Sequence, residues 1–121
     1  MPEQNQQELE KLARDFQILQ EQLRNMGMQI EQLKLQKADL DRAMEELDKA
    51  TGKVYYSVGG IIVETDKEKA KTDVKDRSEL TDTRIKSATK QMDDLKAREK
   101  QLSEKITQLY KQDQGQSEGV A

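Results

Sequence analysis

The sequence predicts a mainly α protein, in which a long antiparallel two-helix coiled coil is joined by a single β-hairpin that assembles into an intersubunit β-barrel. Two apolar stripes predict the coiled coil, because each of them steps by three and four residues along the chain. The stripes are mirror images of one another about Gly59. A short β-branched segment around Gly59-Gly60 predicts the hairpin, because both glycines accept the positive φ of a two-residue turn.

The symmetry of the stripes predicts how the two helices pair. The first stripe begins at Leu9 and the second ends at Leu109, and pairing them from the outside inwards gives the same sum of residue numbers for every pair. The chain is therefore expected to fold back on itself. Polar layers such as Lys37 opposite Thr81 interrupt this seam, and such layers fix the register of a coiled coil at some cost in stability.

The composition supports long helices and excludes several classes of function. Of the 121 residues, 37% are charged and only 3% are aromatic, which is less aromatic core than a compact domain usually has. The net charge is -3 with both signs mixed along the chain, so a nucleic-acid partner is not expected. The chain has no His and no Cys, which excludes imidazole catalysis, disulfides and thiolate metal sites. We expect no enzyme activity and no cofactor.

The chain is also expected to be soluble and cytoplasmic, with no membrane contact. No apolar run approaches the roughly 18 residues of a membrane-spanning helix. The first residues lack the charged and apolar regions of a signal peptide.

Five consecutive segments are expected along the chain. They are a flexible tail over residues 1–7, a coiled-coil helix over 8–50, a hairpin oligomerisation element over 51–65, a second coiled-coil helix over 66–110 and a flexible tail over 111–121. The second helix is expected to begin with Thr65 and Glu68 as a capping box, or with Asp66 as the cap instead. Gly27, inside the first helix, marks either a bend or the close approach of a neighbour.

The hairpin is predicted to need a partner. With the turn at Gly59-Gly60, Val58 faces Ile61, and apolar residues lie on both faces of the two strands. A two-stranded sheet is marginally stable in water, and this one has open edges. Pairing with the hairpins of other chains is the expected solution, and the alternative is that the hairpin folds onto the ends of the helices.

The end of the coiled coil farthest from the hairpin is a second candidate site. Helix ends open most easily, so apolar side chains there are available to another protein. Ordinary packing of the helix ends is the alternative. The residues of this tip set are Leu9, Leu12, Phe16, Leu102, Ile106, Leu109 and Tyr110.

The hairpin segment carries a resemblance to a known family. Residues 54–63 read V-Y-Y-S-V-G-G-I-I-V between two long helices, and this pattern resembles the beta-class subunit of prefoldin, most closely its archaeal form. A single hairpin matches the beta class, since the alpha class has two. In the resemblance, the assembly residues are Val54, Tyr56, Val58, Gly59, Gly60, Ile61, Ile62 and Val63, and the tip set contacts unfolded client proteins.

The resemblance implies a chaperone rather than an enzyme. Prefoldin is a hexamer of two alpha and four beta subunits whose hairpins form a double β-barrel. Its coiled-coil tips hold unfolded proteins and pass them to a group II chaperonin without ATP. This chain is accordingly expected to be an ATP-independent holdase subunit with an alpha-class partner. The alternative is a structural coiled-coil scaffold or adaptor that binds no client.

Overall fold

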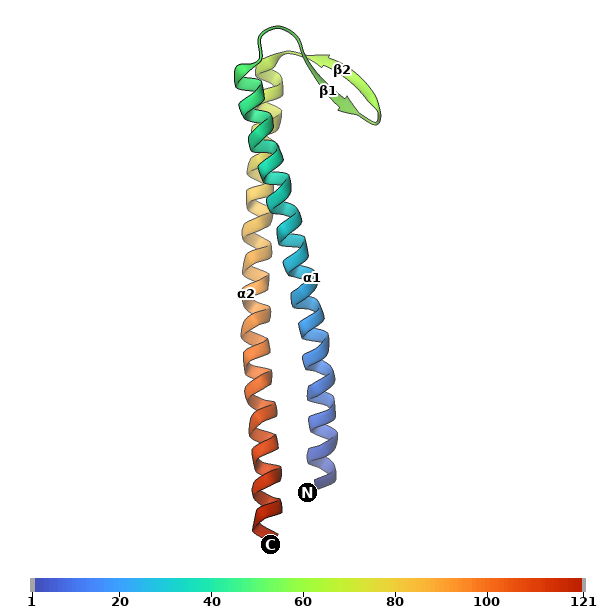
Figure 1. Ribbon diagram of the computed structural model, residues 1–121, viewed down its shortest axis with the longest axis vertical. Helices are drawn as coiled ribbons and strands as arrows, with labels where there is room; N and C mark the ends of the chain where they lie inside the picture. Colours follow the sequence, from blue (N-terminus) through green and yellow to red (C-terminus); the bar gives the residue numbers. More distant parts are fainter. Residues whose placement is uncertain (1, 121) are drawn as a thin grey trace. The chain divides into compact units, whose positions relative to one another are not determined.

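The computed structural model describes residues 2–120 and confirms the predicted order of helix, hairpin and helix (Figure 1). The elements are α1 (Pro2–Lys49), β1 (Val54–Val58), β2 (Ile61–Thr65) and α2 (Lys67–Val120). The chain divides into two compact units. We call residues 1–28 with 89–121 the terminal unit, and residues 29–88 the hairpin unit.

In the terminal unit, the predicted seam joins the first part of α1 to the last part of α2, which run antiparallel (Figure 1). Leu12 and Leu19 are its most deeply buried side chains, and every other stripe residue of this unit is partly buried. Gly27 lies in this seam. The Met92 methyl carbon is 3.7 Å from the place that a Cβ would take at Gly27. A methyl group at this position would be in ordinary van der Waals contact with Met92, so the neighbour lies beside Gly27 without requiring glycine there.

In the hairpin unit, the seam contains small and polar side chains as well as large apolar ones. Ile30, Leu33 and Ala88 are buried, and so is Thr81. The Thr81 hydroxyl donates a hydrogen bond to the Arg77 carbonyl oxygen at 2.8 Å, so its polar group is satisfied within its own helix. Among the described residues, no buried side-chain nitrogen or oxygen lacks a hydrogen-bond partner.

The predicted polar layer at Lys37 is a connected cluster. The Lys37 ammonium donates hydrogen bonds to the Ser78 hydroxyl and to Asp82 Oδ2, the latter at 3.1 Å, and lies 3.6 Å from Asp41 Oδ1. The hydrogen bond to Asp82 raises the pKa of Lys37, so the group stays charged at neutral pH. Because both Ser78 and Asp82 are on α2, this layer favours one register of the two helices.

The helix ends decide one open alternative and differ from the sequence prediction at the two tails. The cap of α2 is Asp66, whose Oδ1 accepts a hydrogen bond from the Lys69 backbone N–H at 2.7 Å, and not Thr65, which ends β2. Helix α1 begins at Pro2 and α2 continues to Val120, so helix covers most of both predicted tails. Met1 and Ala121, the remaining tail residues, lie outside the described part of the chain.

The hairpin register is the predicted one. Val58 pairs with Ile61, Tyr56 with Val63 and Val54 with Thr65 in an antiparallel sheet. Gly59 and Gly60 form the turn with φ of 55° and 82°, values that favour glycine at both positions.

Replacing Gly27 by Ala is expected to stabilise the chain by about 1 kcal/mol, the usual helix-propensity gain. The methyl group meets Met92 at an ordinary van der Waals distance, so no repacking is required. The measurement is the free energy of unfolding in urea. Asn25→Ala, an exposed change two residues away, is the matched control and should give a smaller gain. A loss on Gly27→Ala beside a gain on Asn25→Ala would show that the seam is crowded at this layer.

Candidate functional site

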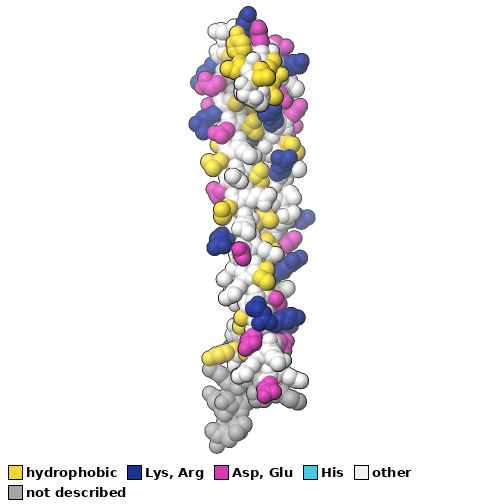
Figure 2. Space-filling view, turned by 90° about the vertical axis from the view of Figure 1, so that its right-hand side faces the viewer, with side chains coloured by type: hydrophobic (Ala, Val, Ile, Leu, Met, Phe, Trp, Pro, Cys, Tyr) yellow, Lys and Arg dark blue, Asp and Glu magenta, His cyan; other side chains and the backbone are white. Residues whose placement is uncertain are grey.

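The hairpin leaves its apolar side chains uncovered on both faces of the sheet. Ile61 and Ile62 point to opposite faces and are 67% and 74% exposed. Figure 2 shows hydrophobic side chains gathered over the hairpin, whereas basic and acidic side chains are scattered over the rest of the visible face. Besides these two isoleucines, the exposed apolar residues of the hairpin are Tyr55, Tyr56 and Val58. Val54 and Val63 are partly buried. Tyr55 was absent from the predicted assembly residues, although it shares a face with Ile62, which was among them.

A hollow separates the hairpin from the helices of its own unit. It has a volume of about 960 Å³ and is lined by β1, the start and end of the adjoining helices and the last residues of β2. Glu46 and Leu47 line it from α1, and Ala70 and Val74 line it from α2. The hairpin therefore does not cover its own apolar residues by folding onto the helix ends.

Hydrogen bonds and an ion pair fasten the two helices where the hairpin begins and ends. The Lys67 ammonium donates to the carbonyl oxygens of Asp48 and Ala50 at 3.1 and 3.2 Å, close to the C-terminal end of α1. Lys71 Nζ lies 2.8 Å from Asp48 Oδ1. The hydrogen bond from Lys71, followed by its positive charge, lowers the pKa of Asp48. These contacts hold the last turn of α1 against the first turn of α2.

The predicted tip set is assembled in the terminal unit, but most of it belongs to the seam. Leu12 is buried, whereas Tyr110 is 56% exposed. The remaining members, which are partly buried, are Leu9, Phe16, Leu102, Ile106 and Leu109. Within this unit the tip residues lie on the paired parts of α1 and α2, with most of their apolar surface partly covered, and their contact with clients stays a prediction.

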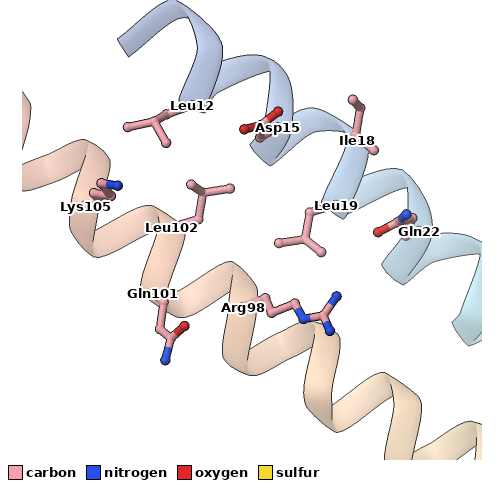
Figure 3. A pocket seen from close by; sticks show the side chains of 9 residues that line it. All are labelled: Leu12, Asp15, Ile18, Leu19, Gln22, Arg98, Gln101, Leu102 and Lys105. Carbon is pink, nitrogen blue, oxygen red and sulfur yellow. The ribbon is translucent and has the colours of Figure 1, made fainter. Parts of the chain in front are cut away.

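A shallow groove opens along one side of this seam. Its volume is about 440 Å³, and Leu12 and Leu19 from α1 and Leu102 from α2 form its apolar floor. In Figure 3, these three leucines lie between the two helices. The outer lining residues are Asp15, Ile18, Gln22, Arg98, Gln101 and Lys105.

The sequence pattern did not identify the edge of this groove. Ile18 is 56% exposed and lies one residue outside the stripe, so the three-and-four spacing passes over it. Arg98 and Lys105 stand among many other surface charges and are distinguished only by the groove beside them. The one available signal was an isoleucine at a position where a coiled coil usually has a polar residue.

The described residues contain no group of three or more His, Cys, Asp or Glu side chains that is placed to hold a metal ion. None of the helices over residues 2–120 has the length and apolar character needed to cross a membrane.

An antiparallel helix pair that presents an open apolar hairpin and an apolar groove belongs to the class of proteins that act by binding other polypeptides. A family model described as "Prefoldin subunit" matches residues 4–113. The chain belongs to the prefoldin subunit family. Its resemblance to the beta class is confirmed by the relatives that it matches.

Two of these relatives are archaeal proteins named prefoldin subunit beta. The one from Methanosarcina acetivorans is 35% identical over 95 residues, which are 77% of this chain and 81% of the relative. The one from Methanothrix thermoacetophila is 34% identical over 110 residues, which are 89% of this chain and 88% of the relative. The crystal structure of the prefoldin beta subunit from Thermococcus strain KS-1 has the same fold, with a TM-score of 0.77, 24% identity, and coverage of 84% of this chain and 90% of that one.

Membership of this family settles the general role of the chain. Prefoldin subunits are chaperones and not enzymes, so the prediction that the chain is not an enzyme is confirmed. The family works in a hetero-oligomer with alpha subunits.

The ion pair between Asp48 and Lys71 is expected to make stability depend on acid pH. Because the folded-state pKa of Asp48 is lowered, its contribution is present above the unfolded-state value of about 3.9 and is lost as the pH falls through the folded-state value. The unfolding free energies of the native chain and Asp48→Asn should therefore converge below about pH 4. Lys71→Gln should show the same convergence, and the double variant should add nothing further. Parallel curves down to the lowest pH would contradict a stabilising pair.

Proposed function

We propose that this chain is the beta subunit of a hexamer of two alpha and four beta subunits, which holds non-native polypeptides without ATP and delivers them to a group II chaperonin. The proposal places it in the cytoplasm. The observation that carries it is the hairpin, whose apolar side chains stay exposed on both faces in the single chain. Family membership supplies the chaperone class.

The hairpin is proposed to be the assembly element. Two strands of five residues each are too short to bury their own side chains, and both outer edges have free backbone groups. Pairing of several hairpins into a barrel would satisfy these edges and cover Ile61 and Ile62. The helix ends are fastened by Lys67 and Lys71, so the strands are presented from a defined base.

The terminal unit is proposed to contact clients. The tip set and the groove beside it place leucine and isoleucine side chains within reach of an unfolded segment. Each contact is weak because the surface is shallow. Several coiled coils in one assembly would raise the effective concentration of contacts, so that the assembly binds far more tightly than one subunit.

The first test removes residues 1–16 and 102–121. These residues contain the tip set. Their removal leaves the sequence of the hairpin unit unchanged. The truncated chain mixed with an alpha-class subunit should keep its native mass by light scattering and lose most of its suppression of aggregation of a denatured client. Full suppression with an intact assembly would contradict client contact at the tip set.

The second test places a charge on the hairpin. Ile61→Asp buries a carboxylate if hairpins pair, at a cost of several kcal/mol, and should give smaller species that remain helical. The measurements are native mass and circular dichroism. Met28→Asp, which changes an apolar residue of similar exposure on α1, is the matched control and should leave the mass unchanged. An unchanged mass for Ile61→Asp would count against the barrel.

A further inference from the structure

The groove beside the seam of the terminal unit has two basic groups on one edge. Arg98 and Lys105 both project from α2, seven residues apart, and both line the groove. Two turns of helix separate them, a distance of about 10 Å along the axis. Two positive charges with this spacing would face the same side of a segment that lies in the groove.

Arg98 and Lys105 have no charged partner in the part of the chain that the structure describes. Neither of them forms an ion pair with any residue that the structure describes, and both side chains are exposed. The opposite edge, on α1, has Asp15 and the uncharged Gln22. Asp15 is also without an ion pair among the described residues, and it is the one carboxylate that lines the groove. The groove is therefore basic along α2 and has one acidic group along α1.

The floor of the groove is apolar, and so is one residue of its outer lining, Ile18. Leu12 and Leu19 are only 7% exposed, and Leu102 is partly buried, so they offer an apolar strip at the base. Ile18 lies on the outer edge of α1 and points away from α2 in Figure 3. An apolar strip between charged edges is the arrangement that accepts one face of an amphipathic helix.

We propose that this groove selects client segments that form an amphipathic helix with carboxylates seven residues apart beside its apolar face. The apolar face lies on Leu12, Leu19 and Leu102, and the two carboxylates face Arg98 and Lys105. A basic residue on the other edge of the same segment faces Asp15. This inference rests on the proposed function, since it specifies which part of a non-native polypeptide the terminal unit prefers.

The preference is modest by its nature. Each exposed ion pair contributes little to the free energy of binding, and salt screens it. Two such contacts give an affinity difference of about three- to tenfold, which is enough to rank segments without excluding others. A holdase with this groove would still accept many clients, because contact between apolar side chains is not directional and does not depend on one sequence.

The test compares two synthetic helical peptides with the same leucines at positions i, i+3, i+4 and i+7. One has glutamates seven residues apart on one edge, and the other has lysines at the same places. Fluorescence anisotropy with the full-length chain should show the acidic peptide binding about three- to tenfold more tightly at low salt. The difference should shrink as the salt concentration rises. Equal affinities at low salt would overturn the proposal.

Two sets of variants locate the effect. The double variant Arg98→Glu with Lys105→Glu should reverse the order of affinity of the two peptides. The control Lys90→Glu with Lys100→Glu makes the same change of charge at exposed positions outside the groove and should preserve that order.

Ile18→Ser should lower the affinity for both peptides equally. Met28→Ser changes an exposed residue that does not line the groove and should lower neither affinity. Retention of the order in the Arg98 and Lys105 variant would overturn the assignment to this groove.

Suppression of client aggregation separates this inference from the proposed function. If the assembly protects a denatured client but shows no peptide preference, the groove proposal fails and the chaperone function stands. If the assembly does not protect the client at all, both fail.

Discussion

The seam between α1 and α2 is the interaction on which the rest of the structure depends. Each unit has only two helical segments, so the side chains between them supply nearly all of the burial that keeps the helices paired. The helix pairing in turn sets the position of both candidate sites. It brings α1 and α2 together at the base of the hairpin through Asp48 and Lys71, and it places Leu12 beside Leu102 to form the groove.

The same constraint explains why this protein acts by contact. A pair of helices has no interior beyond its seam, and the seam is already filled by the side chains that hold it together. Apolar surface that is not needed for the pair must lie outside it. In the part of the chain that the structure describes, such surface includes Ile61 and Ile62 on the hairpin and Ile18 beside the groove, and also Met28, Leu35 and Leu80 on the helices. The hairpin and the groove suit the binding of other polypeptides.

The polar groups of the hairpin unit make the pairing specific. Lys37 occupies a seam position that is usually apolar, and its ammonium donates hydrogen bonds to Ser78 and Asp82 on the facing helix. Replacing a polar layer by leucines would increase burial and would also allow neighbouring registers of similar stability. A shift in register would misalign the two strands that connect the helices. The polar layer thus protects the geometry of the hairpin.

The sequence by itself determined the order of helix, hairpin and helix, the antiparallel pairing and the strand register, but not how far the helices extend into the predicted tails. Apolar periods of three and four and a Gly-Gly turn are local patterns, and each has few structural solutions. Only the tertiary structure decided which residues share a surface. It selected Asp66 over Thr65 as the cap, gave Lys37 its partners, and placed Ile18, Arg98 and Lys105 around one groove. The contacts of Lys37 and the groove join residues far apart in the chain, and the cap depends on the local backbone at Asp66. No periodic pattern encodes either kind of relation.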